Sequence, residues 1–378
     1  MNNPFSYGGI VKGETFCNRI TEQKDLIRAV ENSEKLFIHG ERRIGKTSLL
    51  KAVIQKIEKN SGICFYIDVW KCLDEDDFSR VCASAFAEYA FKEKQSVVER
   101  LKTLFAGITP SFSVDEAGKP SVTLLRARSD KPGPFVDEIL KAPQRVRAIE
   151  PDRPILVVFD EFQQIREISG LKLEQIIRSR VQEQQNVAYF FCGSRTSLLK
   201  KMFLEKSSPL YRSSGHYPIE SISPNHWKPF IKTEFTTTGK SITAETITAL
   251  VEATGGHPFY TQMLCSSLWD ITDNTVSVSD LESATDLLLD RESSTYITLW
   301  NALPEQPRKM LRALAMENPL FKPTSGKTVQ THGFASPSSS KSALTYLIDK
   351  DHAAQNKDGG YFLVDRFLGM WCRRNLTL

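Results

Sequence analysis

Residues 35–50 have the sequence Lys35-Leu36-Phe37-Ile38-His39-Gly40-Glu41-Arg42-Arg43-Ile44-Gly45-Lys46-Thr47-Ser48-Leu49-Leu50. The apolar run at the start predicts a buried strand. It leads directly into Gly-x-x-x-x-Gly-Lys-Thr, and the segment Ser48–Ile57 then has a helical pattern. A glycine-rich turn could match this pattern by accident, but the flanking strand and helix argue against that. The stretch therefore predicts a phosphate-binding loop and a bound nucleoside triphosphate.

Each part of the predicted loop has an expected task. The glycines let backbone N–H groups turn inward around phosphate oxygens, and the helix N-terminus adds the positive end of its dipole. Lys46 is expected to reach the β- and γ-phosphates, and the Thr47 hydroxyl is expected to bind Mg²⁺. The predicted nucleotide contacts in this stretch are Gly40, Glu41, Arg42, Arg43, Ile44, Gly45, Lys46, Thr47 and Ser48.

A second motif, Ile155-Leu156-Val157-Val158-Phe159-Asp160-Glu161, ends in two adjacent carboxylates. The wholly apolar run predicts a strand buried on both faces of a parallel sheet, and ligands bind at the carboxyl edge of such sheets. An Asp-Glu pair after a strand often caps a helix. Beside a phosphate loop, we instead expect Asp160 to hold Mg²⁺ through water and Glu161 to polarise the attacking water.

A polar residue at the end of the neighbouring strand completes the predicted catalytic set. The apolar run 187–192 predicts this strand, and Ser194 follows it closely enough to sense the γ-phosphate or position water. Hydrolysis also needs a positive charge on the γ-phosphate. Arg42 and Arg43 are poorly placed, because loop positions between the glycines mostly point away from phosphate. Arg195 is favoured over Arg212, because it lies at the sheet edge where the active site opens.

Length and composition limit the possible classes of protein. The 378 residues are too many for one ordinary core, so two or three domains are expected. No apolar run reaches the length of a membrane span, and the N-terminus has no secretory signal pattern. Seven cysteines without CxxC spacing, among them Cys64, Cys192 and Cys265 in apolar surroundings, predict reduced core residues and a cytoplasmic protein. A net charge of +4 does not by itself indicate nucleic-acid binding.

The remaining sequence predicts further elements around these motifs. Thr21 is a plausible N-cap for an amphipathic helix at 24–30, and residues 63–69 suit a second buried strand. Alternation at 107–128 predicts a β-hairpin insertion. A short final strand is expected at 216–222. From residue 296 onward, three helices, a hairpin and a last helix at 366–373 form the pattern of a winged helix.

Several motifs together carry a family resemblance. They are Phe16-Cys17-Asn18-Arg19, Gly40 to Ser48, Phe159-Asp160-Glu161, Gly193-Ser194, Pro209-Leu210-Tyr211, Gly255-Gly256-His257-Pro258, and Tyr361-Phe362-Leu363-Val364-Asp365 with Trp371. In these motifs and their order, nearly the whole chain resembles the archaeal-type ATPases of the STAND group. The family usually has Tyr-Gly-Arg after Pro-Leu, whereas this sequence has Tyr211-Arg212. The role of the family's arginine is therefore not assigned to Arg212.

The resemblance implies an α/β P-loop NTPase fold with an AAA-like parallel sheet core, a helical lid and a C-terminal winged helix. The expected division is 1–222 for the core, 223–295 for the lid and 296–378 for the winged helix. Phe16 and Arg19 would lie near the base, and His257 and Pro258, in the turn of the lid, would close over it. ATP and Mg²⁺ are the implied ligands.

Three functions remain open from the sequence. The first is an ATP-hydrolysing switch, turning over slowly, whose winged helix engages a protein or DNA partner in defence or stress signalling, with oligomers possible. The second is an ATP-dependent DNA-binding regulator or loader, similar to replication-origin initiators. Its candidate DNA contacts are Ser338, Ser339, Ser340, Lys341, Thr345, Lys350 and Lys357. The third is a binding module with a weak or inactive ATPase, against which the intact Lys46, Thr47, Asp160 and Glu161 argue.

Overall fold

The computed structural model describes residues 2–9, 17, 19–92, 97–106, 109–114, 120–125, 132–169 and 171–376. The chain divides into two compact units, which we describe separately. The core unit consists of residues 19–42 and 46–219. The C-terminal unit consists of residues 1–18, 43–45 and 220–378.

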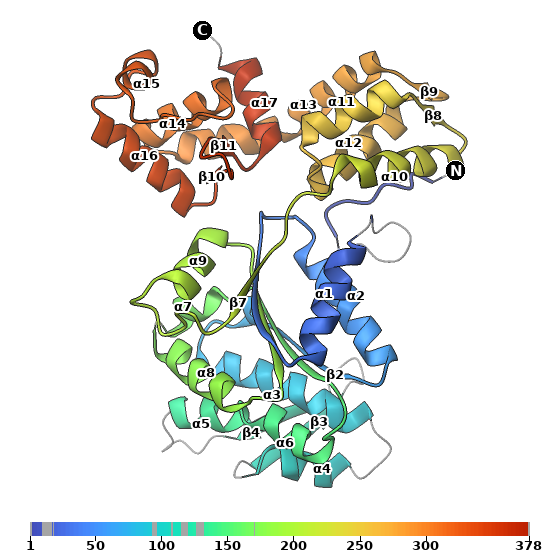
Figure 1. Cartoon of the computed structure of the whole chain (residues 1–378), viewed down its shortest axis with the longest axis vertical. Helices are drawn as coiled ribbons and strands as arrows, with labels where there is room; N and C mark the ends of the chain where they lie inside the picture. The colour runs from blue at the N-terminus through green and yellow to red at the C-terminus, as the bar shows by residue number, and fades with distance from the viewer. Residues whose placement is uncertain are drawn as a thin grey trace. The chain divides into compact units, whose positions relative to one another are not determined.

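A five-stranded parallel sheet forms the centre of the core unit, in the order β2-β5-β6-β1-β7 (Figure 1). Its strands are β1 (Lys35–His39), β2 (Ile63–Asp68), β5 (Ile155–Asp160), β6 (Ala188–Cys192) and β7 (Gly215–Pro218). The strands predicted from the two motifs are confirmed, and β5 is buried at every residue, as a central parallel strand should be. The last strand ends at Pro218 rather than at the predicted residue 222, because its partner β1 ends at His39, whose carbonyl accepts the Ile219 N–H at 2.7 Å.

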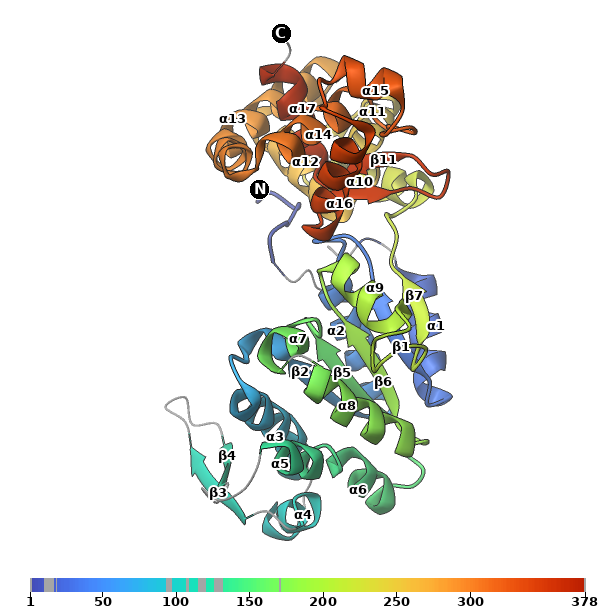
Figure 2. The same cartoon turned by 90° about the vertical axis from the view of Figure 1, so that its left-hand side faces the viewer.

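Helices cover both faces of this sheet. The helices of the core unit are α1 (Ile20–Glu31), α2 (Lys46–Lys59), the short 3-10 helix η2 (Val69–Lys71), α3 (Glu75–Lys92), α4 (Val97–Leu104), α5 (Pro132–Ile139), α6 (Ala142–Ile149), α7 (Gln164–Ser169), α8 (Leu171–Glu183) and α9 (Thr196–Leu204). Helices α1 and α2 lie together on one side (Figures 1 and 2). On the other face, alternate side chains such as Phe65, Phe159 and Phe191 join one apolar core with residues of α3, α5, α6, α8 and α9. Both faces of the central strands are therefore buried.

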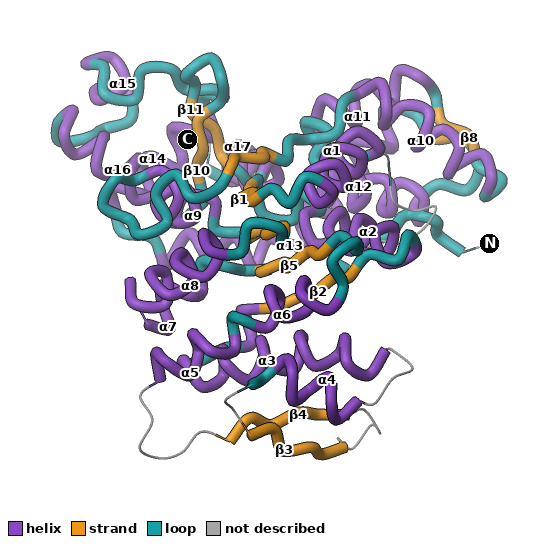
Figure 3. The backbone as a smooth tube through the Cα atoms, turned by 60° about the horizontal axis from the view of Figure 1, so that its bottom comes forward, coloured by secondary structure: helices purple, strands orange, loops and turns teal. Residues whose placement is uncertain are grey.

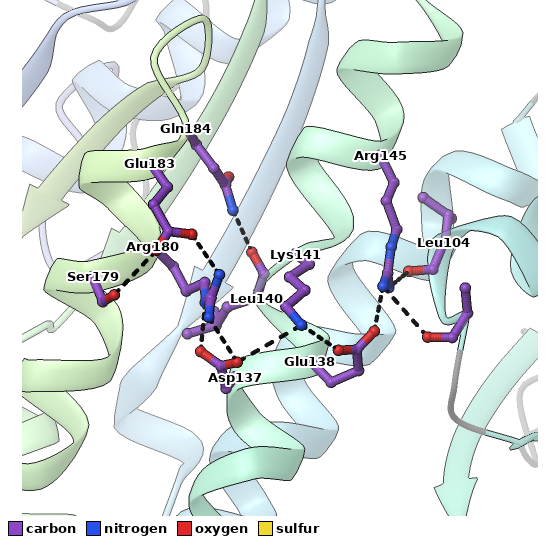
Figure 4. Close-up of polar contacts among 11 residues, drawn as sticks. Leu104, Asp137, Glu138, Leu140, Lys141, Arg145, Ser179, Arg180, Glu183 and Gln184 are labelled. Atoms are coloured by element: carbon purple, nitrogen blue, oxygen red, sulfur yellow. Dashed lines mark hydrogen bonds and ion pairs between the residues drawn. The ribbon is translucent and has the colours of Figure 1, made fainter.

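Ion pairs link helices on one side of the core unit (Figure 4). Arg180 of α8 donates to both carboxylate oxygens of Asp137 in α5, with Nη2 2.9 Å from Oδ2. Glu138 accepts from Lys141 at 2.6 Å and from Arg145 of α6. A two-point Arg–carboxylate pair fixes the orientation of its two side chains better than a single contact does. These ion pairs therefore hold α5, α6 and α8 in fixed positions relative to one another.

The predicted insertion contains an antiparallel strand pair, β3 (Thr109–Val114) and β4 (Pro120–Leu125). The pair forms its own two-stranded sheet, and β4 packs against α3, away from the five-stranded sheet (Figure 3). The predicted turn and the ends of the insertion, residues 107–108, 115–119 and 126–128, lie outside the described residues.

The C-terminal unit begins with a helical part. Its elements are α10 (Pro224–Thr237), β8 (Ser241–Ile242), α11 (Ala244–Thr254), α12 (Pro258–Ile271), β9 (Thr275–Val276) and α13 (Val278–Ala302). The described N-terminal residues pack within this unit. The Phe5 ring lies 5.0 Å from that of Phe235, and Asn3 Nδ2 donates to the carbonyl of Ser266 and to Asp270 Oδ1. The predicted domain boundaries, after residue 222 between core and lid and after residue 295 between lid and winged helix, stay predictions.

The last part of the unit has the predicted order of helices, hairpin and helix. Its elements are α14 (Glu305–Met316), α15 (Gly326–Thr331), α16 (Pro337–Asp349), β10 (Ala353–Gln355), β11 (Tyr361–Leu363) and α17 (Arg366–Asn375). Helix α15 spans only six residues. Leu320 bridges Tyr361, which adds a third segment to the β10–β11 hairpin.

Two local predictions are wrong. Thr21 is not an N-cap, because α1 already begins at Ile20, and Arg19 occupies the cap position with φ of +70°. That turn lets the Arg19 carbonyl accept the Gln23 N–H at 2.9 Å. Cys64 is only partly buried, whereas the other six cysteines are buried, and all seven are free thiols.

Within the described parts of the chain, no helix is both long and apolar enough for a bilayer span.

Candidate functional site

The phosphate loop connects β1 to α2, at the carboxyl edge of the sheet. Gly45 has φ of +89°, and a Cβ there would meet nothing within 4 Å, so the backbone conformation rather than space calls for glycine. The carbonyl of Gly40 accepts the Thr196 hydroxyl at 2.7 Å, which ties the start of the loop to the first residue of α9. Ile44 is buried, whereas Arg42 and Arg43 are exposed.

Lys46 is folded back onto this loop. Its Nζ donates to the carbonyls of Gly40 at 2.9 Å and Glu41 at 2.7 Å, and the residue is 7% exposed. Burial lowers the pKa of Lys46, while the nearby charges of Glu161 and Asp160 act in the opposite direction. A buried ammonium held only by carbonyls can exchange these partners for phosphate oxygens, as predicted for this lysine.

The two predicted magnesium residues meet. Thr47 Oγ1 donates to Asp160 Oδ2 at 2.9 Å, so the helix start after β1 and the end of β5 converge on one carboxylate. A hydroxyl and a carboxylate are hard oxygen donors, which is the donor set that Mg²⁺ prefers. Among the described residues there is no cluster of three His, Cys, Asp or Glu side chains that would favour another metal. These residues fit a magnesium ion.

Tyr66 is a site residue that the sequence reading missed. Its hydroxyl donates to Asp160 Oδ2 at 2.5 Å, and burial together with Asp160 raises its pKa, so it stays a donor. The parallel register pairs Tyr66 with Val158, two residues before Asp160, so Tyr66 and Asp160 lie on the same face of the sheet. The alternation of β2 was the available signal, but using it required the pairing of β2 with β5.

Glu161 follows β5 in an unusual backbone conformation, with φ of +51°. Asp160 supports this turn, because its Oδ1 accepts the Glu161 N–H at 3.0 Å. Glu161 Oε2 accepts the Ser194 hydroxyl at 2.8 Å, the Ser194 N–H at 3.3 Å and Gln163 Nε2 at 2.5 Å. The structure thus brings together the predicted pair Glu161 and Ser194, and adds Gln163, which sequence reasoning missed.

The two candidate arginines differ in their surroundings. Arg195 immediately precedes α9 and forms an ion pair with Glu167, with side chains 43% and 47% exposed. Arg212 is exposed, has φ of +52° and lies with its guanidinium 5.3 Å from the centre of the Tyr211 ring. The structure does not bring either arginine into contact with Lys46 or Glu161, and their assignment stays a prediction.

The predicted base contacts are less closely defined. Phe16 lies outside the described residues. Arg19 is buried and its Nη1 donates to Glu22 at 2.6 Å. His257 is buried, with its ring 4.7 Å from that of Tyr260, and Pro258 is the first residue of α12. Arg19 belongs to the core unit, whereas His257 and Pro258 belong to the C-terminal unit.

Comparison with known protein families gives two matches. Residues 16–264 match a family described as an ATPase domain predominantly from Archaea. Residues 294–374 match a probable winged helix domain. No curated protein matches the chain closely enough to count as a relative.

Solved structures resemble the chain over almost its whole length. The Walker-type ATPase paby2304 of Pyrococcus abyssi is 16% identical, with 98% of this chain and 99% of that chain covered and a TM-score of 0.69. The ORC2 protein of Aeropyrum pernix is 13% identical, with 99% and 98% covered and a TM-score of 0.55. A STAND protein with a tetratricopeptide repeat sensor from Pyrococcus horikoshii is 12% identical, with 99% and 45% covered and a TM-score of 0.41.

At these identities the first two structures establish a shared fold and nothing finer. The predicted fold class is confirmed by the parallel sheet, the P-loop ATPase match and the winged helix match. The family match covers more than half of the chain. This protein therefore belongs to the family of archaeal-type ATPases and carries a C-terminal winged helix domain.

Proposed function

We propose that this protein binds ATP with Mg²⁺, hydrolyses it slowly, and uses the bound nucleotide to switch how its winged helix domain engages a protein or DNA partner. The observation that carries the proposal is the convergence of Lys46, Thr47, Asp160 and Glu161 at one edge of the sheet. Buried charges are retained where chemistry needs them, since burying them otherwise costs stability. The family of ATPases to which the chain belongs supports the same conclusion.

In the proposed reaction, Lys46 leaves the carbonyls of its own loop and binds the β- and γ-phosphates. Thr47 and Asp160 would hold Mg²⁺, which neutralises charge on the phosphates. Glu161 orients a water molecule and takes its proton as the water attacks the γ-phosphorus and ADP leaves. Phe16 and Arg19 are the proposed base contacts, with His257 and Pro258 as lid contacts. Their support is the resemblance of the motifs.

Two measurements test this function. Calorimetric titration with ATP and Mg²⁺ should give one binding site per chain, and phosphate release should follow at a slow, saturable rate. A control reaction with EDTA should release no phosphate above background. Absence of ATP binding at millimolar nucleotide, in protein with an intact melting transition, would contradict the proposal.

Tyr66 gives a prediction about the metal. Tyr66→Phe removes one hydrogen bond to Asp160, and loss of such a supporting partner typically weakens metal affinity by roughly 10–100-fold. We expect the Mg²⁺ concentration for half-maximal ATPase activity to rise about tenfold, with little change in the maximal rate at saturating Mg²⁺. An unchanged Mg²⁺ titration curve would remove Tyr66 from the metal site.

Arg195 is the proposed source of positive charge at the γ-phosphate. Arg195→Ala should lower turnover about tenfold, a modest effect because the side chain is half-exposed and its charge is screened by Glu167. If Arg195 acts on a neighbouring subunit, wild-type activity should rise faster than linearly with protein concentration. Full activity in Arg195→Ala with loss in Arg212→Ala would show that Arg212 is the acting residue.

The winged helix domain supports DNA as a second candidate partner. Residues 294–374 contain eleven lysines and arginines against six aspartates and glutamates, so this domain is more basic than the rest of the chain. Ser338, Lys341, Thr345 and Lys350, at α16 or just after it, are exposed. These are groups that can contact phosphates.

Three of the candidate DNA contacts need revision. Ser340 is fully buried and donates to the carbonyl of Pro323 at 2.6 Å, so it is wrong as a DNA contact. Lys357 on the wing forms an ion pair with Glu220 at 2.7 Å, which it would have to give up. Ser339 donates to Gln306 at 2.8 Å and is only partly exposed.

A salt-dependent titration distinguishes DNA from protein as the partner. If the winged helix binds duplex DNA, log affinity should fall linearly with log salt, because each phosphate contact releases counterions. Lys341→Ala should reduce the slope by about one. A slope near zero, with and without ATP, would remove DNA and leave a protein partner.

The cellular compartment is also a proposal. All seven cysteines are free and six of them are buried. Burial raises the pKa of Cys192 and Cys265, which keeps them as unreactive thiols. Free buried thiols fit a reducing compartment, and we propose the cytoplasm.

A further inference from the structure

Gln163 lies beside the proposed catalytic carboxylate and has no task in the reaction described above. It is 1% exposed, and its Nε2 donates to Glu161 Oε2 at 2.5 Å. Its Oε1 is also buried but has no hydrogen-bond partner among the described residues. A buried amide that satisfies only one of its ends costs stability, so its presence calls for a reason.

The contacts of Glu161 provide that reason. Three hydrogen bonds from described residues reach its side chain, from Gln163 Nε2, Ser194 Oγ and Ser194 N, and all three converge on Oε2. Oε1 of Glu161 accepts no hydrogen bond from the described residues. Three donors on one oxygen fix the orientation of the carboxylate and leave the other oxygen to take a proton.

Gly193 is matched to the same arrangement. A Cβ at Gly193 would lie 1.9 Å from Gln163 Oε1 and 2.8 Å from Leu199 Cδ1. No side chain larger than hydrogen fits while Gln163 keeps its place. Gly193, which directly follows β6, therefore makes room for the Gln163 amide that holds Glu161.

We propose that Gln163 is a positioning residue, which holds the Glu161 carboxylate with Oε2 saturated and Oε1 directed to the attacking water. This inference rests on the proposed function, because it needs Glu161 to act as the base. It makes Gln163 a residue retained for turnover at the expense of stability. The two properties should therefore separate on substitution.

Gln163→Met tests this separation, because methionine has a similar volume but no N–H donor and no carbonyl. We expect kcat to fall about 10–100-fold, the size of one lost hydrogen bond to a charged group, with unchanged ATP affinity. The melting temperature should stay constant or rise, because the unpartnered Oε1 is removed. A fall in melting temperature with unchanged kcat would overturn the proposal and make Gln163 a structural residue.

Gln184 provides a matched control for the same substitution. It is also buried, but both ends of its amide are satisfied: Nε2 donates to the Leu140 carbonyl at 2.7 Å, and Oε1 accepts the Tyr189 hydroxyl. It precedes β6, at the edge of the sheet opposite to Glu161. Gln184→Met should lower the melting temperature and leave kcat unchanged, the reverse of the result for Gln163→Met.

Gly193→Ala should lower kcat as Gln163→Met does, because the added methyl group would displace the Gln163 amide.

A double-mutant cycle distinguishes failure of this inference from failure of the proposed function. In the Glu161→Gln background, Gln163→Met should change kcat less than about twofold, because the carboxylate that it positions is absent. If Glu161→Gln alone leaves kcat unchanged, the proposed function fails. If Glu161→Gln lowers kcat but Gln163→Met does not, the positioning role alone fails.

A crystal structure of nucleotide-free Gln163→Met gives a readout independent of turnover. We expect the Glu161 carboxylate to move, so that Oε2 no longer lies within hydrogen-bond distance of both Ser194 N and Ser194 Oγ. An unmoved carboxylate would contradict the positioning role.

Discussion

Replacement of Lys46 by alanine is expected to weaken ATP binding by at least about 100-fold, because at least two charge-assisted hydrogen bonds to phosphate are lost. Lys46 is only 7% exposed, and charges interact more strongly where water is excluded, so burial increases the expected effect. Titration calorimetry with ATP and Mg²⁺ measures the change directly. The fold should survive, because the hydrogen bonds that Lys46 makes with the described residues go to carbonyls of its own loop.

A lysine on the same helix provides the control for that experiment. Lys56 is exposed on α2, and Lys56→Ala should bind ATP like the wild type. Equal affinities for wild type, Lys46→Ala and Lys56→Ala would mean that the phosphates do not bind at this loop.

Glu161→Gln is expected to lower turnover by roughly 10²–10⁴-fold while ATP still binds, because glutamine keeps the shape of the side chain but cannot take the proton of the attacking water. The amide can still accept the hydrogen bond from the Ser194 hydroxyl through its oxygen. The variant should therefore retain ATP rather than ADP after incubation, as measured by chromatography of the released nucleotide. Formation of ADP at the wild-type rate in this variant would exclude Glu161 as the base.

The parts of the site that the sequence predicted depend on short continuous patterns. The stretch Lys35–Leu50 contains strand, loop and helix in one run, and Ile155–Glu161 contains a buried strand with its carboxylates. Parallel strands present their carboxyl ends at one edge, so the meeting of Thr47 with Asp160 followed from the two patterns alone. Ser194 was predicted for the same reason, since β6 lies between β5 and β1.

The parts that the sequence did not predict depend on pairing and on local backbone geometry. Tyr66 contacts Asp160 only because β2 pairs with β5 in a particular register. Gln163 reaches back to Glu161 because Glu161 adopts a positive φ, which few residues other than glycine favour. No periodicity in the sequence signals such a turn.

Polar residues at helix starts were the other source of error. Serine and threonine near a helix start can cap it, face solvent or bond to a distant carbonyl, and the sequence does not distinguish these states. Ser340 bonds to the carbonyl of Pro323, and Thr21 lies inside α1 rather than at its start. A tertiary neighbour determines the environment of Ser340, whereas Thr21 is exposed because the helix begins one residue earlier than the local pattern indicated.

The central claim is that the phosphate loop and Glu161 together hydrolyse ATP. The most direct test is a single-turnover reaction, in which excess protein is mixed with radiolabelled ATP and Mg²⁺ and free phosphate is followed over time. We predict that wild-type protein converts the bound ATP to ADP and phosphate in one slow phase, and that Glu161→Gln binds the same ATP but leaves it intact. Equal rates in the two proteins, or no phosphate from ATP-bound wild type, would contradict the claim.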